Sequence, residues 1–352
     1  MASINHLAEE MIFQILSWLP VLSLFQCKLV CRSWNSIISS PNFIQAHLAI
    51  SQKKQHPFST LRVVLRSDES QDFFMDTLGE NSVKLSLPRY ISDVPQLLIG
   101  SCNGLVTLGT GVKLYIWNPL IRMGKLLPRA HYLHLEIVNK IGFGFDSLSS
   151  DYKILRVVFG RFSDLFDGEE EEGIVAELYS FNAESWKSIQ VPKEMQGLKL
   201  DPMSKCVCVD SRVLCVRGTD GILSFDLHDE VFKMHKYPAS GKIISEVLDF
   251  EGSIALILRS GDQWASVLTV WALDEVDGNL LWAEKFNIIE PARKIAYVLI
   301  YIGDGKFVAR DYSRAGFFYD MNKRTCVEFR RYISVVQFRG SLLSLQGFGR
   351  LE

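Results

Sequence analysis

The sequence predicts a small all-α domain at the N-terminus followed by an all-β propeller. Residues 7–48 space their apolar side chains as amphipathic helices do. Beyond residue 60 this spacing disappears, and short apolar strands with polar turns recur about every 45 residues. Such a period, with several strands per unit, is typical of propeller blades. We therefore assign residues 1–50 to the helical domain, 51–60 to a polar linker and 61–350 to the propeller.

The first helix is predicted from an apolar half that is unusually wide for its length. That half contains Leu7, Met11, Ile12, Ile15, Leu16, Trp18 and Leu19. The opposite half contains Glu9, Glu10, Gln14 and Ser17. The helix should end at Leu19, because the residue before a proline, here Pro20, is disfavoured in the α region.

Shorter helical segments should follow. Ser23 and Gln26 form a candidate capping box for a helix over residues 24–29. Residues 31–38 place Trp34, Ile37 and Ile38 on one face of a third helix, and residues 43–48 indicate one more amphipathic turn.

A unit of about 40 residues lies at the lower limit for a self-sufficient hydrophobic core. Its two cysteines, Cys27 and Cys31, are best interpreted as small core residues, not as a disulfide or a metal site. We therefore expect a partner protein to cover part of the apolar surface. The alternative is that the helices pack on the domain that follows.

The same residues carry a resemblance to a known family. Residues 7–48 resemble the F-box of plant F-box proteins, with matches at Leu19-Pro20, Ser23-Leu24, residues 30–34 and Ile37-Ile38. Departures from the family pattern are Ala8, Trp18 and Leu22. The resemblance implies docking on the Skp adaptor of a cullin-RING (SCF) ubiquitin ligase. Carried over to this chain, the docking residues are Leu7, Ile12, Leu19, Pro20, Leu24, Val30, Cys31 and Trp34.

Composition excludes several other classes of protein. Of 352 residues, 48% are hydrophobic and 22% charged, and the formal net charge is −2, so the chain lacks the basic footprint of a dedicated nucleic-acid binder. The first residues show no signal peptide, and the longest apolar run, residues 295–302, is far too short to span a bilayer. Seven scattered cysteines suit a reducing compartment, so we expect the cytoplasm, the nucleus or both.

The propeller repeats consist of a strand, a polar turn, and a second strand that often ends in Leu-Pro. The copies cover residues 73–88, 115–128, 178–192, 223–238, 269–289 and 317–330. Their predicted turn residues, expected to tolerate the left-handed conformation, are Asp76, Asn118, Asn182, Asp226, Ala272 and Asp320. Residues 335–339 and 341–345 add two strands without a hairpin, which could join residues 61–65 and close the ring. We expect six blades, with seven blades or an open arrangement as alternatives.

A second resemblance covers the propeller. The motifs at residues 101–106 (SCNGLV), 117–119 (WNP), 142–146 (GFGFD) and 151–153 (DYK), followed by Ser185-Trp186, resemble the F-box-associated domain of plant F-box proteins. That family captures substrates for ubiquitination. The resemblance therefore implies a protein target, whose identity the sequence leaves open.

Other motifs have structural interpretations. Gly142-Phe143-Gly144 is interpreted as a strand-entry turn and residues 303–306 as a hairpin turn, because neither has the spacing of a nucleotide-binding loop. Cys206 and Cys208 should face the same side of a strand near Cys215, without the spacing of a metal site. His131 and His134 have no second pair of potential metal ligands, so they do not indicate a metal site. The acidic residues between 164 and 172 indicate an exposed insertion or a docking loop for a basic segment.

No catalytic, cofactor or metal site is predicted. The favoured function is therefore a non-enzymatic adaptor, in which the helices hold a ligase and the propeller holds a target. The alternatives are an F-box scaffold that acts outside any ligase and, third, a propeller enzyme, which would need a cluster of His, Tyr or carboxylates around the channel.

Overall fold

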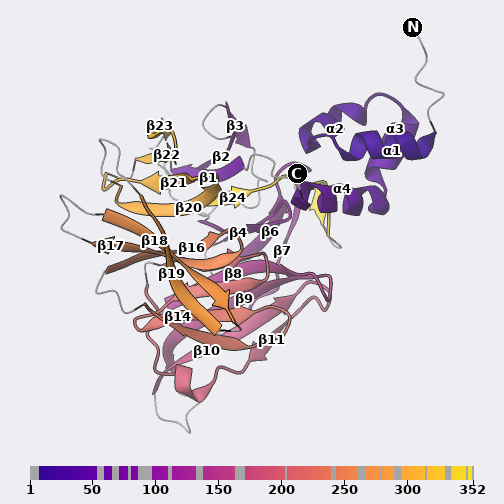
Figure 1. The fold of residues 1–352 in the computed structure, drawn as a ribbon. Coiled ribbons are helices and arrows are strands. Elements are labelled where there is room, and N and C mark those ends of the chain that lie inside the picture. The colour runs from indigo at the N-terminus through magenta and orange to yellow at the C-terminus, as the bar shows by residue number, and fades with distance from the viewer. Residues whose placement is uncertain are drawn as a thin grey trace.

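The computed structural model describes residues 8–53, 59–65, 71–77, 81–85, 97–109, 113–131, 138–162, 171–202, 204–238, 243–260, 267–277, 279–288, 295–313, 315–329, 334–345 and 348–350. The helices within them are α1 (Glu9–Ser17), α2 (Val21–Cys27), α3 (Arg32–Ser39) and α4 (Pro41–Lys53). They form one group beside the sheets (Figure 1). The predicted all-α domain followed by an all-β propeller is therefore confirmed.

Three local details of the helices differ from the sequence-based predictions. The capping box of Ser23 and Gln26 does not form, because α2 already begins at Val21, with Pro20 as its N-cap at φ −59° and no side-chain cap. The predicted final turn is a full helix, α4, which extends past the proposed boundary at residue 50. Ser17 is buried, not exposed on a polar face, and its hydroxyl donates to the Gln14 carbonyl.

The described strands form six antiparallel sheets, five of four strands and one of five. The first two sheets are β24 (Ser334–Phe338), β1 (Ser59–Leu65), β2 (Gln71–Thr77), β3 (Asn81–Leu85); and β4 (Leu97–Cys102), β5 (Leu105–Gly109), β6 (Leu114–Asn118), β7 (Met123–Leu126), β25 (Gly349–Arg350). The next two are β8 (Val138–Asp146), β9 (Asp151–Phe162), β10 (Glu171–Ser180), β11 (Ser185–Ile189); and β12 (Val207–Val209), β13 (Val213–Arg217), β14 (Gly221–Asp226), β15 (Phe232–Lys236). The last two are β16 (Ile243–Phe250), β17 (Ser253–Ser260), β18 (Val267–Val276), β19 (Asn279–Ile288); and β20 (Tyr297–Gly303), β21 (Lys306–Arg310), β22 (Gly316–Asp320), β23 (Thr325–Phe329).

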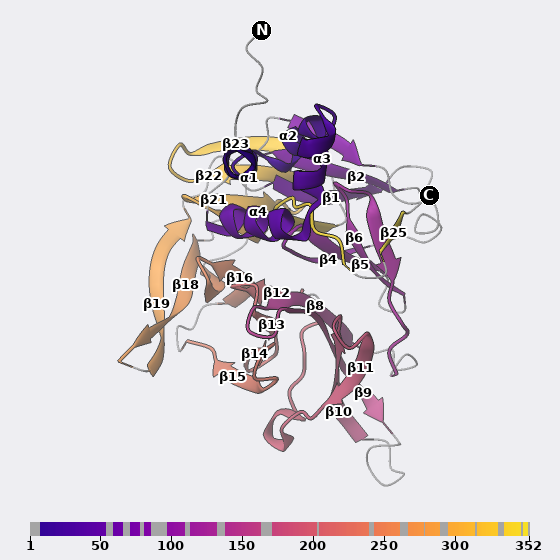
Figure 2. The same cartoon turned by 90° about the vertical axis from the view of Figure 1, so that its right-hand side faces the viewer.

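We expected six blades, and the described strands form five regular four-stranded blades and one sheet of a different pattern. Five sheets are regular four-stranded blades, whereas the sheet of β4 to β7 departs from that pattern because β25 adds a fifth strand beside β7. The first strands of the sheets contact one another in the cyclic order β24, β4, β8, β12, β16, β20 and back to β24. They therefore surround a common axis, with the later strands fanned outward (Figure 2).

The ends of the propeller domain close this ring. β24 pairs with β1 in antiparallel register, with Ser334 opposite Val63 and Phe338 opposite Ser59, as predicted. The predicted second closing strand, residues 341–345, is wrong: the segment makes no strand ladder. Its carbonyls at Ser341 and Leu343 instead accept hydrogen bonds from the buried Asn118 amide.

The two ends of the propeller are defined by hydrogen bonds between neighbouring sheets. At one end, the turns after the first strands are linked, for example by Ser341 Oγ donating to the Asn103 carbonyl and Phe145 N to the Ser211 carbonyl. We call this the helical end, because the helices lie against it. At the other, the far end, the first strands begin, and Leu98 N donates to Ser334 Oγ there.

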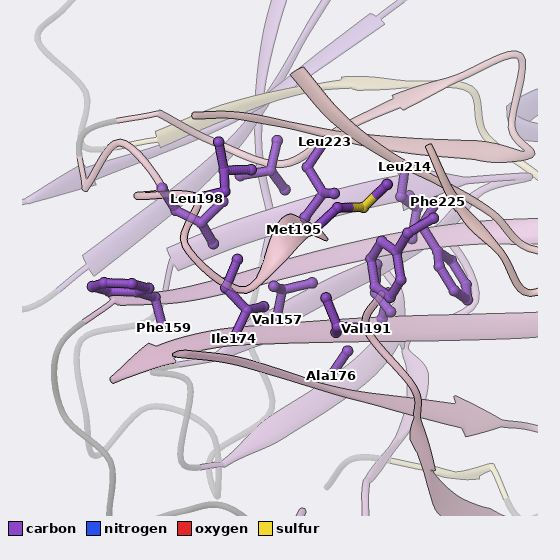
Figure 3. Packing of buried hydrophobic residues seen from close by; sticks show 14 of the residues in the cluster. Val157, Phe159, Ile174, Ala176, Val191, Met195, Leu198, Leu214, Leu223 and Phe225 are labelled. Carbon is purple, nitrogen blue, oxygen red and sulfur yellow. The ribbon is translucent and has the colours of Figure 1, made fainter. Parts of the chain in front are cut away.

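Apolar side chains fill the spaces between neighbouring sheets. Figure 3 shows the cluster between the sheet of β9 and β10 and the sheet of β13 and β14. Val157 and Ala176 come from the first sheet and Leu214 and Phe225 from the second, and all four are almost completely buried. A 3-10 turn, Lys193–Met195, adds Met195 to the same cluster.

Polar turn residues act differently from the prediction. Asn118, Asp226 and Asp320 do not adopt positive φ; their side-chain oxygens instead accept hydrogen bonds from turn amides two or three residues later. This is the usual way in which Asn and Asp stabilise turns. The left-handed residues lie four positions further on, at Arg122, Glu230 and Arg324.

The glycines of the GFGFD motif lie inside β8, so the predicted strand-entry turn is wrong. A Cβ on Gly142 would lie 2.5 Å from Cys206 Sγ, and one on Gly144 would lie 2.5 Å from Leu227 Cδ1. Glycine is therefore required by the close approach of the next sheet. By contrast, Asp304 and Gly305 form the predicted hairpin turn, both with positive φ.

Candidate functional site

The helical domain has a small core of its own. Leu16, Val21, Leu24, Ile38 and Phe43 are buried together. His47 is also buried, and its Nε2 lies 2.9 Å from the Leu19 carbonyl oxygen. This contact joins α4 to the end of α1, so the helices hold a defined arrangement.

The propeller completes this core. Leu342, which follows β24, is buried in the same cluster, and Leu120 and Ile121 from the turn between β6 and β7 pack against it. The helices thus pack in part on the following domain, which is the alternative left open from the sequence. The contact fixes the helical domain at one end of the propeller (Figures 1 and 2).

A second apolar stripe of the helical domain remains exposed. Met11, Ile15 and Trp18 follow one another at helical spacing along α1, on a different side from the core residue Leu16. Leu22 on α2 and the turn residues Leu29 and Val30 are also exposed. We call these six residues, which are 51% to 87% exposed, the helical apolar surface. Apolar patches of this kind mark interaction sites.

The predicted docking residues do not all share this surface. Leu24 is fully buried at 0% exposure and contributes to the internal core, and its assignment to the docking face stays a prediction. Ile12, Leu19 and Trp34 are half-buried against that core. Pro20, Val30 and Cys31 are exposed. Leu7 lies outside the described residues.

Sequence reasoning missed five of the exposed residues as candidates for docking. They are Met11, Ile15, Trp18, Leu22 and Leu29. The signal was present in the unusually wide apolar half of α1, because a helix that packs on one side only needs a single stripe. Two apolar stripes on α1 indicate that the helix packs against neighbours on two sides.

The remaining candidate residues have structural roles. Cys206 and Cys208 pack against one apolar cluster as predicted, whereas Cys215 lies in the next one, and burial raises the pKa of all three thiols. Nδ1 of His131 lies 2.8 Å from Glu177 Oε1. Asp164, Asp167 and His134 lie outside the described residues. No group of three His, Cys, Asp or Glu side chains among the described residues is placed to hold a metal ion.

Charged residues gather around the start of the first strands at the far end. Arg217, at the end of β13, donates from Nη1 to the carbonyls of Ile244 and Ser245 in the next sheet, at 2.7 and 2.6 Å. Arg259, at the end of β17, bonds the carbonyls of Ile295 and Ala296 in the same way. Arginines thus connect consecutive sheets at this end.

None of the described helices is long and apolar enough to cross a membrane.

Comparison with known proteins agrees with this division into helices and sheets. The sequence profile of the F-box domain matches residues 4–45, and that of the F-box associated beta propeller domain matches residues 48–332. The chain belongs to the F-box-associated β-propeller family. The helical domain is its F-box.

Individual relatives come from Arabidopsis thaliana. "F-box protein At3g07870" is 24% identical over 318 residues, covering 81% of this chain and 73% of that protein. "F-box/kelch-repeat protein At3g23880" is 24% identical over 311 residues, covering 82% and 81%. Among solved structures, an oligogalacturonate lyase in complex with manganese is 11% identical and aligns with a TM-score of 0.43 over 75% of this chain and 71% of that one.

Proposed function

We propose that this F-box protein is the substrate-recognition subunit of an SCF ubiquitin ligase. Its F-box docks on a Skp-type adaptor, and its propeller binds the protein to be ubiquitinated. The ubiquitin-transfer chemistry takes place on other subunits, so the chain itself is a non-catalytic adaptor that raises the effective concentration of the target. We place this activity in the cytoplasm or nucleus, in keeping with seven cysteines that form no disulfide.

The observation that carries this proposal is the helical apolar surface. The F-box buries one stripe of α1 in its own core and leaves the second, Met11, Ile15 and Trp18, exposed, and Leu22 on α2 is exposed as well. Burying a large aliphatic or aromatic side chain contributes about 1.5–3 kcal/mol. A partner that covers this surface therefore gains enough free energy for a stable complex even after the cost of association.

The position of the F-box also suits an adaptor. Its core contains Leu342, so the helices and the propeller are held as neighbours and not joined by the linker alone. The far end of the propeller is then directed away from the F-box. A target bound there leaves the helical apolar surface open to the ligase.

Co-purification with a Skp-type adaptor tests the proposal. We expect Leu22→Asp to abolish adaptor binding, because it places a charge on the helical apolar surface. Leu281→Asp is the matched control: Leu281 on β19 is also 54% exposed but lies on the propeller. It should bind the adaptor as the native chain does.

Two further results would decide the assignment. Replacement of Leu19-Pro20 by Ala-Ala should also abolish adaptor binding while the propeller remains folded, as judged by circular dichroism. If the native chain does not bind any Skp-type adaptor, it acts outside a ligase, as a scaffold, and the proposal is wrong. If Leu22→Asp and Leu281→Asp bind equally well, the docking surface is wrong.

A further inference from the structure

β19 (Asn279–Ile288) differs from the other strands at the outer edges of the sheets. It has ten residues, whereas β3, β11, β15 and β23 have five each and β25 has two. No described strand pairs with its outer edge. Figure 2 shows β18 and β19 as a long hairpin on the rim of the ring. A long unpaired edge of this kind is a template for the addition of a further strand.

The pairing of β19 with β18 shows which backbone groups reach this edge. Val276 pairs with Asn279, so two residues separate the strands, and the positive φ of Asp277, 51°, suits such a turn. The pair that flanks a two-residue turn exchanges both of its hydrogen bonds, and pairs with and without these bonds then alternate. Leu280 and Trp282 therefore belong to the pairs without them. Their N–H and C=O groups point away from β18 and toward the open edge.

The regular part of this edge ends at Lys285. The register shifts between Val270 and Trp271, so Lys285 has no partner on β18, and its Nζ lies 2.6 Å from Asp274 Oδ2. Bulges and charged side chains are the usual protection of an edge strand against further pairing. Residues 279–283 contain neither a bulge nor a charge. The first half of β19 is therefore the part that is open to a partner strand.

Apolar side chains accompany the open half on both faces of the sheet. Leu280 and Leu281 are 52% and 54% exposed and, as consecutive strand residues, point to opposite faces. Val276, at the end of β18, is also exposed. Trp282 is half-buried, and its Nε1 donates to the Lys236 carbonyl of the neighbouring sheet at 2.7 Å. The edge is thus held in place before a partner binds, which lowers the entropy cost of binding.

Carboxylates beside this apolar patch determine the charge of the partner. Glu275 and Asp277 flank Val276, both are exposed, and neither makes an ion pair with a residue that the structure describes. Lys285 is the only lysine or arginine of the two strands, and it already pairs with Asp274. A second copy of this hairpin would therefore bring like charges together. A segment that carries lysine or arginine complements them.

We propose that the open half of β19 adds an extended segment of the target as a further strand, in which apolar residues alternate with lysine or arginine. The inference rests on the proposed function, in which the propeller binds the target, and it adds the place of binding and the chemical class of the segment. The backbone of the segment pairs with the N–H and C=O groups of Leu280 and Trp282.

The alternation follows from the two faces of the hairpin. Glu275 pairs with Leu280, so these two side chains share one face of the sheet, and Leu281 lies on the other. Basic side chains of the added strand extend along the first face, where their methylene groups cross Leu280 and their charged ends reach toward Glu275. The apolar side chains lie on the second face and cover Leu281.

The position of β19 agrees with this assignment. Figures 1 and 2 show the hairpin on the rim of the ring, apart from the F-box helices. A segment bound to this edge therefore leaves the helical apolar surface open. Strand addition also requires no rearrangement of the ring, because the sheet that receives the strand is already formed.

The first test measures binding of three fluorescent octapeptides to the full chain. One alternates valine with lysine, one valine with glutamate, and one serine with lysine. We expect the valine–lysine peptide to bind at least tenfold more tightly than either of the others. Equal binding of both lysine peptides would show charge attraction alone, and equal binding of both valine peptides apolar association alone. Either result overturns the proposal, as does no binding of the valine–lysine peptide up to about 1 mM.

Hydrogen exchange of backbone amides tests strand addition directly. The amides of Leu280 and Trp282 should exchange at least tenfold more slowly in the complex saturated with the valine–lysine peptide than in the free chain. The amide of Leu281, which bonds to β18, should exchange slowly in both. Unchanged exchange of Leu280 and Trp282 in the saturated complex overturns the proposal.

Substitutions locate the binding edge. Leu280→Lys adds a cation to the open edge and should lower the affinity for the valine–lysine peptide at least tenfold. The control is Val327→Lys, because Val327 is 47% exposed and lies on β23, a short outer strand. It should leave the affinity unchanged. An equal loss in both variants, or in neither, overturns the proposal. Circular dichroism spectra confirm that each variant is folded.

Charge reversal tests the chemical class of the segment. The double variant Glu275→Lys, Asp277→Lys should bind the valine–glutamate peptide more tightly than the valine–lysine peptide. An unchanged preference for the valine–lysine peptide overturns the assignment of basic residues to the segment. Light scattering tests the other occupant: a native chain that forms dimers which Leu280→Lys dissociates would assign the edge to a second copy and overturn the proposal.

Failure of this inference can be told apart from failure of the proposed function. Leu22→Asp should lose the adaptor but keep its affinity for the valine–lysine peptide. Leu280→Lys should lose the peptide but keep the adaptor. Adaptor binding by a chain that shows no preference for this peptide leaves the ligase role intact and overturns only the strand addition.

Discussion

The two ends of the propeller are built from different interactions. At the helical end, apolar side chains and uncharged hydrogen bonds hold the chain end and the F-box, with Leu342 and Asn118 at the centre. Lys153 there pairs with the buried Asp146 and donates to the Leu227 carbonyl of the next sheet. At the far end, arginine and lysine side chains bridge the sheets through backbone carbonyls. The helical end thus attaches the F-box, whereas the contacts at the far end join sheet to sheet.

The largest effect is expected from breaking the attachment of the F-box. Leu342→Asp places a carboxylate in the F-box core and should cost about 4 kcal/mol, because a buried charge without a partner is strongly unfavourable. Limited proteolysis should then release the helical domain faster than in the native chain. The control is Ser344→Asp, since Ser344 is exposed two residues away. Equal proteolysis of both variants would show that Leu342 is not the point of attachment.

A smaller effect is expected from loosening the chain end that carries Leu342. The fully buried Asn118 donates to the Ser341 and Leu343 carbonyls at 3.0 and 2.8 Å and accepts from Leu120 N. Asn118→Ala leaves these groups without partners and should destabilise the chain by about 2–3 kcal/mol in denaturant titrations. Asn322→Ala, which removes an exposed amide from the turn between β22 and β23, should cost less than about 1 kcal/mol.

The far end should respond to pH in the range over which Glu246 titrates. Because folding raises the pKa of Glu246 from 4.5 to about 7, the folded chain binds more protons in this window, and its stability falls as the pH rises through it. Glu246→Gln removes this loss. The variant should be about 1–3 kcal/mol more stable than the native chain at pH 8 and about equal to it at pH 4.5. Thermal unfolding at both pH values measures the difference, and an equal gain at both would argue against a titrating Glu246.

The smallest effect is expected from an exposed ion pair at the helical end. Lys125 and Glu184 lie 2.7 Å apart, but Glu184 is mostly exposed to solvent. Glu184→Gln should therefore change the free energy of unfolding by less than about 1 kcal/mol. A larger loss would mean that this exposed pair, and not only the buried Lys153–Asp146 pair, stabilises this end.

The comparison also explains which strands could be predicted. The second strands of the sheets, such as β9 and β17, are continuous apolar runs and were recognised from the sequence. The first strands were mostly missed, because they combine glycine, cysteine and charged residues. β8 contains Lys140 beside two glycines that the neighbouring sheet requires. The composition of the first strands is set by close packing around the axis. Such packing leaves no regular period in the sequence from which these strands could be predicted.

The docking surface shows the same limit on a smaller scale. Helical spacing identifies the apolar residues of α1 and α2, but it does not tell which stripe faces inward. Leu24 is buried and Leu22 is exposed, although they lie two residues apart in the same helix and have the same side chain. Only the packing of α1, α3 and α4 around Leu24 separates core from surface.

The sequence by itself determined the order of domains, the helical spacing of the F-box, the repeat period of the propeller and the family, because these depend on patterns within about 50 residues. Tertiary structure decided how the ring closes, where the F-box is attached and which charges meet at the far end. Those features join residues such as Leu24 to Leu342 and Leu98 to Ser334. Contacts over such distances arise only when all the sheets pack around one axis, since no local preference specifies them.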